Sequence, residues 1–256
     1  MDTIGAAIGP ILALVFLYFY PNKYKTIFIL AIVPGIISII LSLLLKDKKN
    51  NPLENKNKIS FFGYFKYWEK SSVGYKQLLI GLLAFTLFNS SDVFLLLVLK
   101  NKGMSDTTMI GFYIFYNLVY ALFSYPIGIL ADKIGLKTII IIGLILFAFV
   151  YLSISFASGY LMLGILFGIY GIYASATEGM SKALISNISA PSETATAIGF
   201  YSSFSSIATL IASSLAGFIW FKFTPAYTFV FSGIGVVLVV IYFLIIFGKQ
   251  KSKLTI

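Results

Sequence analysis

Residues 107–158 read TTMIGFYIFYNLVYALFSYPIGILADKIGLKTIIIIGLILFAFVYLSISFAS. Two apolar runs, Thr107–Leu130 and Thr138–Ser158, lie on either side of a short segment that holds the only charged residues of this stretch. About 20 helical residues cross the hydrocarbon core of a bilayer, and each run reaches that length. The stretch therefore predicts two membrane-spanning helices joined by a tight, charged turn.

The whole chain has the same apolar character. Of its 256 residues, 59% are hydrophobic and 11% are charged, and the mean hydropathy is +0.95. A typical soluble domain carries about 25% charged residues, so lipid must supply most of the solvent here, which predicts an all-α integral membrane protein. Histidine and cysteine are absent, which removes imidazole and thiol chemistry and the usual ligands of transition metals. We therefore expect no enzyme, no cofactor and no metal site.

Six further apolar runs bring the predicted membrane spans to eight. The full set is Ile4–Tyr20, Thr26–Leu45, Gln77–Leu99, Thr107–Leu130, Thr138–Ser158, Tyr160–Ser186, Thr196–Phe221 and Pro225–Phe247. If successive spans alternate in direction, thirteen lysines fall on one side of the membrane and five on the other. The positive-inside rule then places the lysine-rich side, with both termini, in the cytoplasm. The net charge of +10 is thus interpreted as a topology signal of a multi-pass protein in the cell inner (plasma) membrane, and no nucleic acid is expected as a partner.

The longest loop, residues 46–76, divides two spans from six. Its first part, KDKKNNPLENKNK, is polar, whereas its second, ISFFGYFKYWEK, interleaves aromatic residues with lysine and predicts a helix lying in the membrane interface. Residues 4–13 share four apolar positions with residues 207–216, as if the first two spans ended a unit similar to the last six. We expect residues 1–45 to be the last two helices of an incomplete N-terminal bundle, 46–76 a cytoplasmic linker, and 77–256 a complete six-helix C-terminal bundle.

The turn between the fourth and fifth spans carries the most specific motif, YPIGILADKIGLK at residues 125–137. Glycine lets a chain reverse within a few residues. An acid flanked by bases can engage a helix N-terminus and release it when one bundle rocks against the other. This pattern predicts a conformational latch, for which a charged turn that only fixes topology is the alternative. The latch residues are Gly128, Asp132, Lys133, Gly135 and Lys137.

The motif resembles the cytoplasmic signature of the Major Facilitator Superfamily, G-x-L-a-D-[RK]-x-G-[RK]-[RK], with Leu136 in place of one usual base. Residues 1–10 resemble the start of that family's fifth span, residues 89–97 the seventh and residues 178–184 the tenth. The resemblance implies a helical bundle of the Major Facilitator type in which this chain, as if truncated at the N-terminus, holds spans five to twelve. Where relatives carry an arginine before the eleventh span, residues 191–195 read PSETA, which leaves the latch with fewer basic partners.

Charged residues inside spans are candidate functional groups, because a charge in hydrocarbon is costly. Asp92 shares a helical face with Asn89, and we expect it to carry a proton or coupling ion or to bind a cationic group of the substrate. Glu178 and Lys182 lie four residues apart and are expected to pair and to switch on protonation. The structural alternatives are an interhelical hydrogen bond for Asp92 and a lysine that reaches toward the cytoplasmic interface for the pair.

Two further features concern the interior of the spans. Tyr113 and Asn117 share a face and, with Tyr116, bring polar groups to mid-span, so we expect them to line a cavity. The sixth span carries four spaced glycines, which favour close packing against another helix. These are Gly164, Gly168, Gly171 and Gly179.

Taken with the resemblance, these features predict a secondary active transporter that moves a small solute by alternating access, coupled to a proton or an ion. Efflux of amphipathic compounds, as by an antiporter, fits the aromatic and weakly charged spans. The expected partners are the lipid bilayer, a small-molecule substrate and a coupling ion or proton. The alternative is a truncated or split-gene membrane protein that transports nothing alone and needs a partner chain to supply the missing helices.

Overall fold

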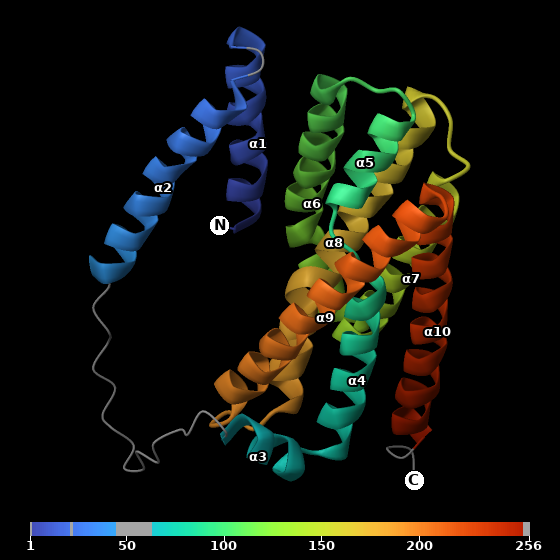
Figure 1. Cartoon of the computed structure of the whole chain (residues 1–256). Helices are drawn as coiled ribbons and strands as arrows, with labels where there is room; N and C mark the ends of the chain where they lie inside the picture. Colours follow the sequence, from blue (N-terminus) through green and yellow to red (C-terminus); the bar gives the residue numbers. More distant parts are fainter. Residues whose placement is uncertain (1, 21–22, 45–62, 253–256) are drawn as a thin grey trace.

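The computed structural model describes residues 2–20, 23–44 and 63–252, and these ranges contain helices and no strand (Figure 1). The helices are α1 (Asp2–Phe19), α2 (Tyr24–Leu44), α3 (Gly63–Lys70), α4 (Val73–Phe88), α5 (Val93–Asn101), α6 (Asp106–Ile134), α7 (Leu136–Ile154), α8 (Tyr160–Ile188), α9 (Thr194–Lys222) and α10 (Pro225–Ser252). The all-α class is therefore confirmed for the described part of the chain.

Seven described spans are long and apolar enough to cross a membrane, with α4 and α5 counted as one segment from Val73 to Asn101. The first span contains a shorter apolar stretch, Ile8–Phe19. A helical membrane bundle is thus supported, whereas the count of eight and the cytoplasmic termini remain predictions.

The third predicted span, Gln77–Leu99, is divided. α4 ends at Phe88, α5 begins at Val93, and the connection between them runs through the middle of the bundle (Figure 1). Asparagine, serine and aspartate side chains compete with the helix for backbone hydrogen bonds. Here the backbone N–H of Ser91 donates to Ser213 Oγ of α9 at 3.3 Å. The expectation of one continuous helix is therefore wrong, and we call residues 89–92 the helix break.

The core of the described helices is rich in aromatic side chains. Those with at most 1% of their surface exposed include Tyr75, Phe147, Tyr151, Phe167, Phe229 and Phe243. α7 packs extensively against α8 and α10, and α6 packs against α8. The two halves of the broken helix are held by other contacts, because α4 packs against α9 and α10 and α5 packs against α6.

One glycine explains how closely α6 and α8 approach. A Cβ atom on Gly171 would lie 2.6 Å from the backbone oxygen of Tyr116, so only glycine fits without a shift of α6. Gly164 and Gly168 also face α6, through Phe112 and Phe115 at 3.9 and 3.5 Å. Gly179 has no such neighbour within 4 Å, so close packing is confirmed at Gly171 and is wrong for Gly179.

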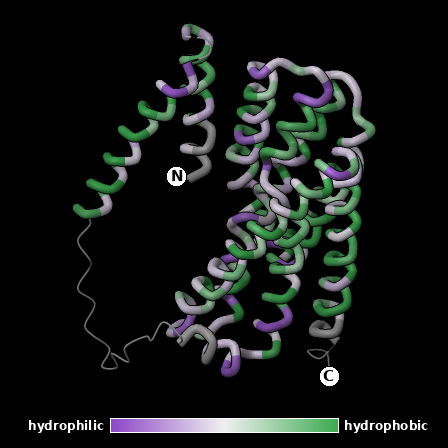
Figure 2. The backbone as a smooth tube through the Cα atoms, viewed as in Figure 1, coloured by the Kyte–Doolittle hydropathy of each residue, from purple (hydrophilic) through white to green (hydrophobic). Residues whose placement is uncertain are grey.

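The N-terminal helices lie at the side of this bundle. α1 packs against α6, whereas α2 contains no buried residue. Most of α2 is coloured as hydrophobic in Figure 2, and its Phe28 and Leu43 are 75% and 80% exposed. Apolar surface of this extent must be covered by lipid or by protein.

The short helix α3 lies within the segment expected to form an interfacial helix; residues 46–62 of the linker lie outside the described residues. Its Trp68 ring stacks on Phe200 of α9, with centroids 6.0 Å apart and an interplanar angle of 10°. Lys76 Nζ lies 5.7 Å from the centroid of the same Trp68 ring. Aromatic contacts of this kind fix α3 against the end of the bundle, while its place relative to the membrane stays a prediction.

Candidate functional site

The Asp92 carboxylate lies where three elements meet. Asp92 occupies the N-cap position of α5, but its side chain makes no capping hydrogen bond. Instead, Tyr116 Oη of α6 donates to Oδ2 and Tyr170 Oη of α8 donates to Oδ1, each at 2.5 Å. Each carboxylate oxygen thus accepts one phenolic hydrogen bond from a different helix. Charge-assisted bonds this short are among the strongest a side chain makes.

Tyrosine side chains surround this carboxylate, and we call the group the tyrosine cluster. Its members and their exposed fractions are Tyr116 (6%), Tyr151 (0%), Tyr170 (3%) and Tyr173 (4%). Tyr170 lies 5.3 Å from Tyr116 and 5.0 Å from Tyr173 between ring centroids. Because these rings pack on one another, they leave the Asp92 carboxylate only partly exposed, and a lower local dielectric strengthens its polar contacts.

Three oxygen atoms near the helix break have no hydrogen-bond partner among the described residues: Asn89 Oδ1, Ser90 Oγ and the Tyr151 hydroxyl. The amide nitrogen of Asn89 does have a partner, since it donates to Tyr173 Oη at 3.1 Å. Buried polar atoms in folded proteins nearly always have partners. A group of three without one, beside a carboxylate, marks the helix break as the candidate functional site.

Of the residues selected from the sequence, Asn89 and Asp92 lie together at the helix break. Tyr113 and Asn117 lie next to it: the Tyr113 ring contacts the Tyr116 ring at 5.2 Å, and Asn117 Nδ2 donates to the Tyr113 carbonyl at 2.8 Å. Asn117 is 3% exposed. These two residues support Tyr116 from its own helix, and their role in lining a cavity stays a prediction.

Glu178 and Lys182 lie further along α8, and both are exposed. Glu178 is close enough to Tyr173 to act on its hydroxyl electrostatically, which connects this part of α8 with the tyrosine cluster. Their mutual ion pair and the proposed protonation switch stay predictions.

The latch residues lie around the turn between α6 and α7. Gly135 alone separates the two helices and has φ = +93°, a conformation that glycine adopts without steric cost. Asp132 and Lys133 are exposed, whereas Lys137 lies with its Nζ 4.9 Å from the centroid of Phe247 in α10. Gly128 faces only Met180, at 4.0 Å. The tight, charged turn is confirmed, and its action as a latch stays a prediction.

Sequence reasoning did not select Tyr151, Tyr170 or Tyr173. A three-residue spacing places Tyr170 and Tyr173 on one face of α8, but many tyrosines in this chain have such a neighbour. What distinguishes these three is their contact with the helix break, which depends on how α7 and α8 pack. No pattern within either helix reports that contact.

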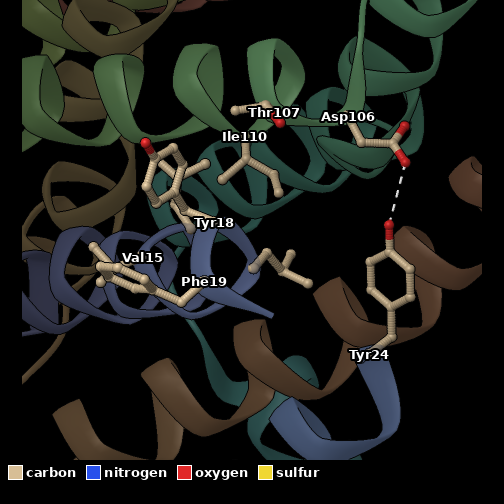
Figure 3. Close-up of a pocket in the computed structure, with 9 residues that line it drawn as sticks. Val15, Tyr18, Phe19, Tyr24, Asp106, Thr107 and Ile110 are labelled. Atoms are coloured by element: carbon tan, nitrogen blue, oxygen red, sulfur yellow. Dashed lines mark hydrogen bonds between the residues drawn. The ribbon is translucent and has the colours of Figure 1, made fainter. Parts of the chain in front are cut away.

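A separate cavity of about 450 Å³ lies between α1, α2 and α6, away from Asp92. Figure 3 shows Val15, Tyr18 and Phe19 along one wall, and the Tyr24 hydroxyl directed at Asp106. That hydroxyl donates to Asp106 Oδ2 at 3.4 Å, and Lys100 Nζ lies 3.5 Å from Oδ1. Asp106 is 55% exposed in this ion pair, so its charge is solvated and already paired. This cavity is therefore separate from the polar site at Asp92.

These features define a class of protein: a multi-pass helical membrane protein with one carboxylate held among tyrosines inside its bundle. Residues 78–255 match the family model of the Major Facilitator Superfamily, and the chain belongs to this family. Within the described residues, no group of three or more histidine, cysteine or carboxylate side chains is placed to hold a metal ion.

A relative supports the assignment. The chain is similar to an uncharacterised MFS-type transporter of Methanocaldococcus jannaschii, with 34% identity over 239 residues. The similarity covers 91% of this chain and 58% of the relative, so the chain spans less than two thirds of that protein's length. No solved structure matches the chain.

Proposed function

We propose that this protein moves a small solute across the membrane by alternating access, and that a proton or an ion bound at Asp92 couples the movement to a gradient. Membership of a transporter family and similarity to a protein named as an MFS-type transporter support transport itself. The single observation that supports coupling at Asp92 is its position: a carboxylate inside the bundle, bound by hydroxyls of α6 and α8.

The physical argument starts from the cost of a charge within the bilayer. Such residues are rare, face the interior of a bundle and are characteristic of ion and proton pathways. Asp92 also lies at a break in a helix, and discontinuous helices frequently form the ion and substrate sites of secondary transporters. Binding or release of a cation there would change the charge between α5, α6 and α8, and so bias their packing.

The wider organisation belongs to the same proposal. The main core cluster runs from Tyr67 to Phe243 and includes no described residue of α1 or α2. This favours a six-helix bundle after the linker, with residues 1–45 belonging to a separate bundle. The turn at Gly135 would act as the latch on the cytoplasmic side of the plasma membrane, and the aromatic interior favours efflux of an amphipathic solute.

The test uses the full chain in proteoliposomes with an imposed pH or sodium gradient and the fluorescent amphipathic dye ethidium as the first of a panel of solutes. We expect wild-type protein to move solute in response to the gradient, and Asp92→Asn to abolish the gradient dependence. Asp106→Asn is the matched control, because Asp106 is an exposed carboxylate in a surface ion pair. Unchanged coupling in Asp92→Asn would remove Asp92 from the mechanism.

A further inference from the structure

We infer that the helix break between α4 and α5 binds one sodium ion, held by the Asp92 carboxylate together with oxygen atoms of Asn89, Ser90 and Tyr151. This inference deepens the proposed function, on which it rests for the coupling step alone, by naming the cation. The binding itself is argued from the structure of the site.

The first argument is the set of oxygen atoms without partners. Ser90 and Tyr151 are 4% and 0% exposed, so bulk water does not reach their hydroxyl groups. Neither hydroxyl, nor Asn89 Oδ1, forms a hydrogen bond within the described part of the chain. Burial of polar atoms without partners is costly, and a bound cation would satisfy all three at once.

The second argument is that these atoms surround one place. Asn89 and Ser90 belong to the helix break itself, as does Asp92. The Tyr151 hydroxyl, from α7, lies close enough to Ser90 and Tyr170 for weak hydrogen bonding and is within electrostatic range of Asp92, although no contact of this hydroxyl has full hydrogen-bond geometry.

Charge decides the class of ion. The site contains one carboxylate, and its other oxygen atoms are neutral, so a monovalent cation balances the site whereas a divalent ion would leave a net charge in a medium of low dielectric. Oxygen ligands suit hard cations, and the chain contains neither histidine nor cysteine for softer metals. A proton would use Asp92 alone and would leave Ser90 and Tyr151 without partners.

An organic ammonium ion fits less well, although tyrosines are present. Aromatic recognition requires ring faces turned toward an open space. Here the rings face one another: Phe147 stacks on Tyr151 with centroids 3.9 Å apart, and Tyr170 contacts Tyr116 and Tyr173 at 5.3 and 5.0 Å. The polar atoms that lack hydrogen-bond partners are oxygen atoms, and these favour a small, dehydrated cation as the ligand.

The experiment measures binding directly. Purified full-length protein in lipid nanodiscs is prepared in choline chloride, and ²²Na⁺ binding is measured at constant ionic strength, with potassium as competitor. We expect saturable binding, weaker competition by potassium, and a rise in Tm with sodium. Asp92→Asn should abolish binding, and Ser90→Ala and Tyr151→Phe should each weaken it about tenfold or more, the effect of losing one ligand to a charge.

The controls remove a hydroxyl of the same kind elsewhere. Tyr227→Phe alters an exposed tyrosine, and Ser203→Ala alters an exposed serine bonded to the Gly199 carbonyl of its own helix. Both should bind sodium like the wild type. Tm in choline chloride identifies any variant that fails to fold, and a wild type without saturable sodium binding would overturn the inference without any variant.

Two results would overturn the inference: no saturable ²²Na⁺ binding by the wild type, or unchanged binding in both Ser90→Ala and Tyr151→Phe. The first result combined with proton-driven solute movement would leave the proposed function intact and assign the free oxygen atoms to water. Sodium binding without transport of any solute would support the ion site and count against the transport proposal.

Discussion

At the scale of single residues, the hydrogen bonds of Asp92 are the feature most open to test. Tyr116 and Tyr170 each donate to a separate oxygen of the carboxylate. We expect Tyr116→Phe and Tyr170→Phe each to lower the free energy of unfolding by about 1–2 kcal/mol, because each removes a donor to a charged acceptor from a buried site. Chemical denaturation in detergent micelles, with Tyr227→Phe as the control, measures the change.

The same variants show whether the bonds act through Asp92. In an Asp92→Ala background, either Tyr→Phe change should lower the free energy of unfolding by much less, because the hydrogen-bond acceptor is already absent. The difference between the changes in the two backgrounds is the coupling energy of the tyrosine and Asp92. Equal costs in both backgrounds would mean that the tyrosines stabilise the bundle by packing alone.

Half of this site could be predicted from the sequence. Asp92 and Asn89 are conspicuous because polar residues in an apolar span are costly. The contacts of Asp92 with Tyr116 and Tyr170 could not be predicted in this way, because the two tyrosines lie 24 and 78 residues from Asp92 along the chain. Only the packing of α6 and α8 brings them together. Tyr116 was selected with Tyr113 and Asn117 as a polar group at mid-span, but its hydrogen bond to Asp92 was not predicted.

At the scale of elements, the broken helix shows what hydropathy cannot resolve. The apolar run Gln77–Leu99 is long enough for one span, and the structure extends the segment to Val73–Asn101. The run of Asn-Ser-Ser-Asp at residues 89–92 offers the backbone alternative hydrogen bonds, such as that from the Val93 N–H to Ser91 Oγ at 3.4 Å. In addition, Ser213 Oγ of α9 accepts a hydrogen bond from the Ser91 backbone N–H. That acceptor lies in another helix, so the break follows from tertiary contacts as well as from local sequence.

The approach of α8 to α6 depends on Gly171. A methyl group there would meet the Tyr116 carbonyl oxygen at 2.6 Å and Val119 Cβ at 2.8 Å. We expect Gly171→Ala to destabilise the protein by about 1–3 kcal/mol through overpacking and to weaken any function of Asp92, because it displaces Tyr116. Gly179→Ala on the same helix is the control, since nothing lies within 4 Å. Equal Tm values for the two variants would show that α6 shifts at little cost.

The turn at Gly135 allows a similar comparison. Because φ of Gly135 is +93°, an alanine in its place would be strained. We expect Gly135→Ala to lower the free energy of unfolding by about 1–2 kcal/mol. Gly128→Ala, which meets only the end of Met180 at 4.0 Å, should be nearly neutral. Tm in micelles measures both changes. A neutral Gly135→Ala would mean that the turn relaxes to another conformation.

At the scale of the whole molecule, spans are predicted well because their length and hydropathy are set by the bilayer. Contacts between helices are predicted poorly, because a helix in lipid is apolar on every side and its pattern does not mark the face that packs. α2 shows this: it is as apolar as the central helices, yet no residue of it is buried.

Topology is the prediction that concerns the molecule as a whole, and the absence of cysteine makes it easy to test. Ser158 and Ser192 are exposed and flank α8, whose 29 residues span about 44 Å at 1.5 Å per residue. The two serines must therefore lie on opposite sides of a bilayer. The distribution of lysines places Ser192 in the cytoplasm. In intact cells, a membrane-impermeant maleimide should label Ser158→Cys, and it should label Ser192→Cys only after permeabilisation. The reverse pattern would place both termini outside and contradict the positive-inside assignment, and labelling of both in intact cells would mean that α8 does not span the membrane.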